Sequence, residues 1–319
     1  MLRTADNISR WLIVVVGMGL LTAPVLFGHG PGEHTPVREQ YDSVWRAWTF
    51  PALVTTNLLL VGGLYGTGLS RLWRRAGTGS GIQKRQAGAF AVGFFVLAIA
   101  LVSPIDALSD ELGWMHMIQH MLIMNVAAPL LVLGSPGIAM LWVLPLKQRR
   151  WFGSLKQRGN LGKVTHYMFW QPLVLWLLYA LTLWVWHLPA LYERALQNEL
   201  FHDFQHFTFL VTSALFWRVL LDPVSRLRLS RVGAAFYLFL TSLHATILGV
   251  FMTLAPGVWY ATYEGRTSFW NISALEDQQL AGLIMWMPAC AAYAIIMAIT
   301  LTLWLEKAPT GGFRKEALR

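Results

Sequence analysis

Two pairs of histidines, each spaced four residues apart, are the residues of this chain best suited to chemistry. His116 and His120 lie in a methionine-rich run, and His202 and His206 lie some eighty residues further on. Residues four apart share one face of a helix, which is the spacing that two-ligand metal sites use. Both pairs open long apolar segments, where ionisable residues generally mark functional sites. The two pairs therefore predict a metal or cofactor site.

The composition places these pairs in a membrane protein. The chain is 55% hydrophobic and 13% charged, with a mean hydropathy of +0.48. A bilayer-spanning helix needs about 20 mostly apolar residues, and tryptophans at many segment ends match the aromatic belts of membrane interfaces. The predicted fold is all-α, a polytopic transmembrane helical bundle with seven core spans plus an N-terminal span. The expected spans are 11–27, 50–70, 86–104, 115–134 with an apolar continuation to 145, 169–187, 205–221, 234–255 and 279–305.

The distribution of charge predicts the orientation of these spans. The net charge of +9 could indicate nucleic-acid binding, but the 25 Lys and Arg residues are very unevenly distributed. If the spans alternate from a cytoplasmic N-terminus, all but Arg38, Arg46, Arg194 and Arg266 fall on one side. An excess of Lys and Arg in cytoplasmic loops is the usual topology signal of membrane proteins. We therefore expect a cytoplasmic C-terminus, contact with membrane lipid, no nucleic-acid partner, and both histidine pairs toward the outer side.

The expected outer loops carry most of the acidic residues, which suits capture of a cation. They are Glu33, Glu39, Asp42, Asp106, Asp110, Glu111, Glu193, Glu199, Asp203, Glu264, Glu276 and Asp277.

The predicted domain organisation has one large unit with short ends. Residues 1–28 form a membrane anchor or signal segment, and a retained helix is favoured because no small-x-small cleavage site follows the apolar run. Residues 29–45, with His29 and His34, read as an extracytoplasmic linker. Residues 46–306 form the seven-helix transmembrane domain, and 307–319 form a cytoplasmic tail. The single cysteine, Cys290, offers no disulfide or paired-thiol metal site and is read as packing.

Further side chains extend the candidate site. Met124 continues the stripe of His116 and His120 on the fourth span. His187 ends the next span on the same side, and His244 lies near mid-membrane with Met252 above it. Imidazole with thioether favours monovalent copper, while an all-imidazole set also suits divalent copper or zinc. Any one of these histidines could instead form an interhelical hydrogen bond, worth about 0.6–2 kcal/mol.

Three sequence blocks resemble a known family in the same order. They are residues 116–136, which begin with His116-Met117-Ile118-Gln119-His120-Met121, the block Trp186-His187-Leu188-Pro189-Ala190-Leu191-Tyr192 leading to His202 and His206, and residues 277–288. Together they resemble the polytopic CtaG-type cytochrome c oxidase assembly factors over about residues 45–305. The resemblance implies a bacterial plasma (inner) membrane protein that matures haem-copper oxidase, with cytochrome c oxidase subunits as partners and copper as its cargo.

The resemblance and the residue chemistry together order the candidates. His116, His120, His202 and His206 are the first metal ligands, followed by His244 and His187, with Met124 and Met252 as thioether candidates. Asp277 is expected to orient a ligand or to accept the cation transiently.

Three functions stay open at this point. The first is a non-enzymatic, copper-binding assembly factor. The second is a redox membrane protein that binds haem b between histidines of two facing helices. The third is a metal-free scaffold for oxidase subunits, whose histidines only hydrogen-bond between helices. The sequence also leaves open whether the chain forms a homo-oligomer.

Overall fold

The computed structural model describes residues 37, 43–155, 172–221 and 229–305. Within these residues every regular element is helical, which confirms the predicted all-α class. The predicted N-terminal span, most of the 29–45 linker and the 307–319 tail lie outside the described residues, so those expectations remain predictions.

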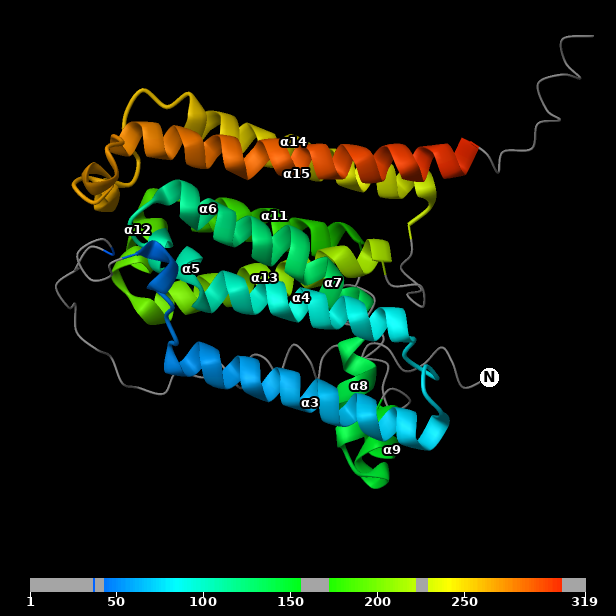
Figure 1. Ribbon diagram of the computed structural model, residues 1–319. Helices are drawn as coiled ribbons and strands as arrows, with labels where there is room; N and C mark the ends of the chain where they lie inside the picture. Colours follow the sequence, from blue (N-terminus) through cyan, green and yellow to red (C-terminus); the bar gives the residue numbers. More distant parts are fainter. Residues whose placement is uncertain (1–36, 38–42, 156–171, 222–228, 306–319) are drawn as a thin grey trace, which may run out of the picture.

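The described chain forms a bundle of long helices that run roughly along one axis (Figure 1). Six helices are long and apolar enough to cross a membrane, and a bent pair raises the number to seven, in agreement with the seven core spans predicted from the sequence. The six are α3 (Ala52–Ala76), α4 (Lys84–Val102), the continuous run α6–η2–α7 (Gly113–Leu133), α13 (Glu199–Leu221), α14 (Arg231–Thr253) and α15 (Ala274–Leu305). The bent pair is α11 (Pro172–Trp186) with α12 (Pro189–Gln197), which meet at 73°.

Large apolar side chains cover the outer faces of these helices. More than half of the surface of Leu59, Phe95, Leu181 and Phe236 is exposed. In water such residues would be costly, whereas lipid tails are as apolar as the side chains themselves. The exposed faces therefore fit the predicted contact with lipid.

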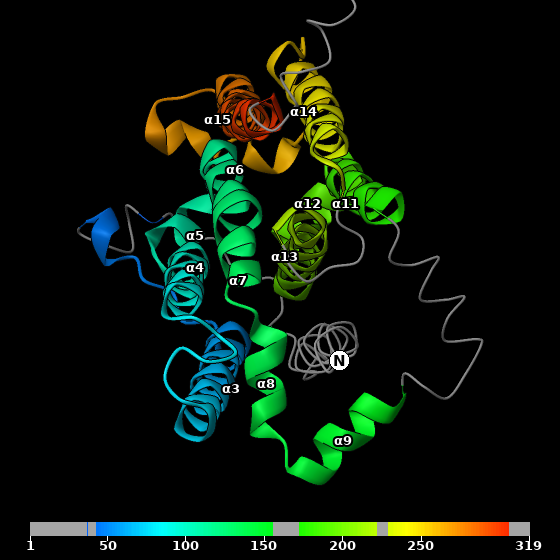
Figure 2. The same cartoon turned by 90° about the vertical axis from the view of Figure 1, so that its right-hand side faces the viewer.

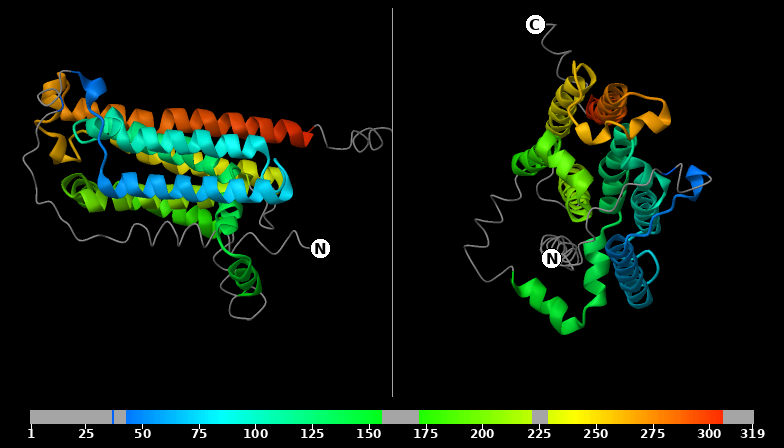
Figure 3. Two further views of the ribbon diagram at one scale, coloured as in Figure 1. Left: turned by 60° about the horizontal axis from the view of Figure 1, so that its bottom comes forward. Right: turned by 90° about the vertical axis from the view of Figure 1, so that its left-hand side faces the viewer.

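The two ends of the bundle differ in chemistry. Short helices gather at the end on the left of Figure 1, seen end-on in the right panel of Figure 3. They are η1 (Val44–Arg46), α5 (Pro104–Ser109), α12, η3 (Ala261–Tyr263) and η4 (Thr267–Trp270). The opposite end carries the basic ends of α3 and α4 and the basic helix α9 (Leu146–Leu155).

The two C-terminal helices, α14 and α15, pack side by side (Figure 2). A Cβ atom added at Gly249 would lie 2.5 Å from Trp286, and one at Gly282 would lie 2.7 Å from the Gly249 carbonyl oxygen. Small residues let membrane helices approach closely where van der Waals packing drives their association. α15 is thereby held in place, and its first turn in turn contacts the start of α6.

The span that carries the first histidine pair is not a uniform α-helix. α6 (Gly113–Met121) continues as a π-helical segment, η2 (Leu122–Ala127), and then as α7 (Ala128–Leu133). The predicted apolar continuation to residue 145 becomes a separate helix, α8 (Pro136–Val143), because Ser135 adopts a left-handed conformation with φ 51° and Pro136 starts a new helix. π-helical turns inside α-helices often accompany functional sites.

Candidate metal centre

The two predicted histidine pairs meet between α6 and α13. The first pair lies in α6 and the second in α13. α13 begins at Glu199, six residues before the span expected from the sequence, so it includes both His202 and His206. Within the pairs, the ring centroids of His116 and His120 lie 4.2 Å apart, as do those of His202 and His206. Across the helices, His116 lies 5.1 Å from His202 and His120 lies 5.4 Å from His206. The four imidazoles therefore form one cluster.

Three members of this cluster have the geometry of a metal site. His116, His120 and His206 each offer a ring nitrogen, and these three nitrogens all lie within 4.8 Å of one another. Nitrogen ligands bound at about 2.0 Å around a single ion would lie roughly 3.3–3.5 Å apart. Small rotations of the rings would close that difference, so the three side chains fit a single small cation.

The imidazole nitrogens of the cluster lack other partners. His116 and His120 are each only 1% exposed, and His206 is 6% exposed. Among the described residues, neither ring nitrogen of His116 or His120 has a hydrogen-bond partner, and the Nε2 atoms of His202 and His206 have none either. A buried polar atom without a partner costs about 1–3 kcal/mol. A bound cation would satisfy one nitrogen of each ring and leave the other as an N–H donor.

His187 lies at the edge of the cluster. Its ring centroid is 6.4 Å from that of His120, and its Nδ1 lies 2.7 Å from the Leu183 carbonyl oxygen. A carbonyl can only accept, so this contact places the proton on Nδ1 and leaves Nε2 as the free acceptor. His187 Nε2 is also buried without a partner among the described residues. His187 is thus prepared as a further ligand.

The other predicted ligands lie apart from the cluster. His244 contacts the rings of Trp176 and Tyr179 at 5.4 and 6.2 Å, on the α11 side of α14. Met252 is fully buried in the apolar core. His244 does not belong to the group of three histidines that the geometry brings together.

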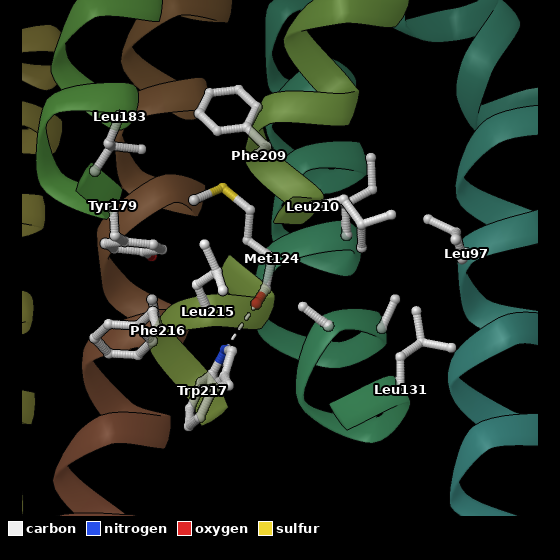
Figure 4. Packing of buried hydrophobic residues seen from close by; sticks show 14 of the residues in the cluster. Leu97, Met124, Leu131, Tyr179, Leu183, Phe209, Leu210, Leu215, Phe216 and Trp217 are labelled. Carbon is white, nitrogen blue, oxygen red and sulfur yellow. Dashed lines mark hydrogen bonds between the residues drawn. The ribbon is translucent and has the colours of Figure 1, made fainter. Parts of the chain in front are cut away.

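Met124 also packs in the apolar core, beyond the end of the α-helix that carries the histidine pair. The α-helix that carries His116 and His120 ends at Met121, and the wider π-helical turns of η2 change the helical phase beyond it. Figure 4 shows Met124 among buried apolar side chains, its carbonyl oxygen accepting a 2.9 Å hydrogen bond from the Trp217 indole. The assumption of one continuous α-helix through Met124 is therefore wrong.

Asp277 holds the helix rather than a histidine. Its Oδ2 accepts a 2.7 Å hydrogen bond from the Gly113 amide, and its Oδ1 accepts one of 3.3 Å from the Trp114 amide. These amides belong to the first turn of α6, where backbone donors have no partner within the helix. A carboxylate there also interacts favourably with the helix dipole. Asp277 thus fixes the start of the helix that presents His116 and His120.

Three tyrosines, which the sequence analysis did not single out, cover the cluster at the end of the bundle that carries the short helices. The Tyr192 ring lies 5.1 Å from that of His116 and stacks on Tyr260 at 3.9 Å. The hydroxyl groups of Tyr192 and Tyr263 lie 3.3 Å apart, and Tyr260 donates to the His187 carbonyl oxygen at 3.0 Å. Tyr192 belongs to a family-like block, but Tyr260 and Tyr263 come from a loop whose path no sequence period predicts.

Gln205 is a second residue that the sequence analysis missed. It lies on α13 between His202 and His206 and is fully buried. Its amide interacts with His116, although the pair does not reach full hydrogen-bond geometry. An amide oxygen in this position could accept a hydrogen bond from the N–H of a histidine whose other ring nitrogen binds a metal.

Carboxylates in and just after α5 border the cluster. Asp106 accepts hydrogen bonds from Thr49 at 2.8 Å and from Gln119 at 2.7 Å. Burial is the largest influence on this carboxyl group and raises its pKa to about 6, with a smaller contribution from the negative charge of Glu199. Burial likewise raises the pKa of Asp110 to about 7. The approach to the cluster is therefore acidic and partly shielded from solvent.

Fold and site together define a polytopic helical membrane protein with a buried polyhistidine centre near one end of its bundle. The family model of the cytochrome c oxidase caa3 assembly factors, Caa3_CtaG, matches residues 63–307. The chain therefore belongs to this family, as the resemblance of the three sequence blocks predicted.

The curated relatives that the chain matches are mycobacterial. The chain is 24% identical over 307 residues to the uncharacterized proteins Mb0105 of Mycobacterium bovis and MT0111 of Mycobacterium tuberculosis, an alignment that covers 91% of this chain and 45% of each relative. It is 23% identical to the uncharacterized protein ML1998 of Mycobacterium leprae, over 86% of this chain and 42% of the relative. The chain thus spans less than half the length of these relatives. No solved structure matches it.

Proposed function

We propose that this protein binds a copper ion as cargo at the histidine cluster and supplies it to a subunit of cytochrome c oxidase during assembly. The observation that carries the proposal is the group of three buried imidazoles, whose ring nitrogens lie within 4.8 Å of one another. Membership of the oxidase assembly factors supplies the process in which such a cargo is needed. The protein acts in this role by binding and release rather than by catalysing a reaction.

The ligand chemistry supports copper. Imidazole suits copper and zinc, whereas calcium and magnesium prefer oxygen ligands. His116, His120 and His206 would hold the ion, with His202 and His187 next to them, and Gln205 and Asp277 would orient His116 and its helix. Met124 and Met252 are thioether candidates that lie in the same buried cluster as Tyr192 and Phe209.

The packing favours one small ion over haem b. Two axial histidines of a haem must face each other across a flat macrocycle. Here the imidazoles contact one another directly, and Tyr192 and Phe209 lie against His116 and His120 with centroid distances of 5.1 and 4.6 Å. A metal-free scaffold fits less well for another reason, because the nitrogens expected to hydrogen-bond between helices have no such partners among the described residues.

Copper analysis of the purified, full-length protein tests the proposal. Wild type should retain stoichiometric copper without a Soret band, and His120→Ala or His206→Ala should lose most of it. His244→Ala is the matched control and should retain its copper, since this membrane histidine lies apart from the cluster. His29→Ala and His34→Ala should lose less copper than either cluster variant. A Soret band, zinc in preference to copper, or equal losses in all five variants would overturn the proposal.

An assembly assay tests the cellular part of the proposal. In a strain that lacks the protein, wild type should restore the copper content and activity of the oxidase. His120→Ala, present in the membrane at wild-type levels, should not. Full restoration by both His120→Ala and His206→Ala would show that assembly does not depend on this centre.

A further inference from the structure

A stripe of polar residues on α13 leads from the outer end of the helix to the histidine cluster. Glu199, Asp203 and His206 are spaced four and three residues apart and so follow one face of the helix. Burial increases along the stripe: Glu199 is exposed, Asp203 is half-buried and His206 is buried. The stripe therefore joins the surface to a residue of the metal centre.

A cleft beside the cluster contains the inner part of this stripe. It lies between α3, α4, η2 and α13, is open on one side, and has about 730 Å³ of empty space, part of it continuous with the surroundings. Its walls are mostly apolar, and its polar residues are Asn57, Asp203 and His206. His206 is only 6% exposed, and its Nε2 has no partner among the described residues. A carboxylate and an unpartnered ligand nitrogen thus share one cleft.

A third carboxylate faces the stripe from another element. Asp106 on α5 interacts electrostatically with both Glu199 and Asp203. Three acidic groups from two elements therefore act on one another, and the charges acting on Asp203 are both negative. Like charges held close together are unfavourable, and a passing cation relieves their repulsion.

We propose that Glu199, Asp203 and Asp106 form a transit site through which the cargo cation reaches and leaves the histidine centre. The inference rests on the proposed copper function and assigns a route to it. Carboxylate oxygens are hard ligands that hold copper more weakly than imidazoles do. The ion therefore moves inward from weaker to stronger ligands, with no change of oxidation state and no covalent step.

Copper-loading kinetics of the purified full-length protein test this route. The probe is a coloured copper–chelator complex, whose loss of colour reports transfer to the protein. Clefts lined by one sign of charge raise the association rates of ions by about 10- to 1000-fold, an effect that salt weakens. Asp203→Asn should load about tenfold more slowly than wild type and reach the same final stoichiometry. Glu199→Gln should slow loading in the same direction and reduce its dependence on ionic strength.

Glu264→Gln is the matched control, because Glu264 is an exposed carboxylate at the same end of the bundle and should leave the rate unchanged. If Asp203→Asn fails to fold, Glu199→Gln carries the test at an exposed position.

Wild-type rates in both variants would overturn the route. So would a loss of final stoichiometry in Asp203→Asn at an unchanged rate, since Asp203 would then belong to the metal centre itself. Absence of copper from wild type would instead overturn the proposed function, and the route would fall with it.

Discussion

At the scale of single residues, the centre concentrates atoms that are costly to bury. His120 is 1% exposed, and both of its ring nitrogens lack partners among the described residues. Each such atom costs about 1–3 kcal/mol in the metal-free protein. Protein sites built for binding often sacrifice stability in this way. The histidines therefore make sense as ligands and not as stabilising contacts.

This cost leads to a prediction for His120→Phe. The variant keeps an aromatic ring next to Phe209, which lies 4.6 Å from the His120 ring, but removes the unpaired nitrogens. Its metal-free form should unfold at the same temperature as wild type or higher. Copper should raise the melting temperature of wild type by mass action and leave that of the variant unchanged. His244→Phe, as control, should keep the copper-induced rise, and a full rise in His120→Phe would contradict the assignment of this ligand.

Asp110 gives a prediction about pH. Burial is the largest influence on the Asp110 carboxyl group and raises its pKa to about 7. The negative charge of Asp106 acts in the same direction, as do those of Glu111 and Glu199 to a smaller extent, whereas the positive charge of Arg266 lowers the pKa. The unfolded value is about 3.9. The folded state therefore holds the proton more tightly, and the stability contributed by this group is lost as pH rises through about 7.

Asp110→Asn cannot ionise, so it should melt at a higher temperature than wild type at about pH 8 and by a smaller margin at about pH 5. The contact from Arg266 survives the substitution, because it is made to the Asp110 backbone carbonyl oxygen. Thermal unfolding at the two pH values measures the difference. An equal shift at both would show that the carboxyl group is charged throughout this range.

At the scale of elements, the register of α6 depends on α15. Asp277 binds the first two amides of α6, and a Cβ at Gly113 would lie 2.8 Å from the Asp277 Oδ2. A side chain at position 113 would therefore displace the carboxylate from its contact with the helix. Through this contact, α15 sets the position of the helix that carries His116 and His120.

We expect Asp277→Ala to lower the free energy of unfolding by about 1–2 kcal/mol, as loss of a helix cap does, and to weaken copper binding about tenfold, as loss of a supporting partner does. Asp277→Asn keeps one acceptor oxygen and should lose less of both. Thermal unfolding and copper competition assays measure the two effects. Unchanged copper affinity in a destabilised Asp277→Ala would mean that α6 keeps its register without the cap.

The sequence predicted those parts of the site that depend on helical spacing alone. The i,i+4 pairs share helix faces as expected, and three of the four lead histidines form the closest group. The π-helical segment was not predictable, since nothing in the apolar run 122–127 distinguishes it from an α-helix. His244 and the tyrosine cover depend on helix rotation and on a loop path, which only tertiary packing decides.

At the scale of the whole molecule, charge and site chemistry separate along the bundle axis. The basic residues Arg71, Arg74, Arg75, Lys84 and Arg85 lie where α3 ends and α4 begins. The histidine centre and its carboxylates lie toward the other end, beside α5 and the start of α13. Because basic loops usually remain cytoplasmic, we predict that the centre lies toward the outer face, where the transit site would meet incoming or outgoing copper.

Cysteine labelling in intact cells tests that orientation. The chain has a single cysteine, Cys290, whose sulfur lies 3.0 Å from the hydroxyl groups of both Ser242 and Thr246. Cys290→Ser keeps a hydrogen-bonding group there and provides a background without thiols. Thr78 and Glu264 are exposed at opposite ends of the bundle, so Thr78→Cys and Glu264→Cys report on the two faces.

A membrane-impermeant maleimide should label Glu264→Cys in intact cells and Thr78→Cys only after the cells are opened. The background variant should stay unlabelled in both conditions. The reverse pattern would place the histidine centre at the cytoplasmic face. Copper would then have to enter the transit site from inside the cell, and charge asymmetry would have failed as a guide to the direction of delivery.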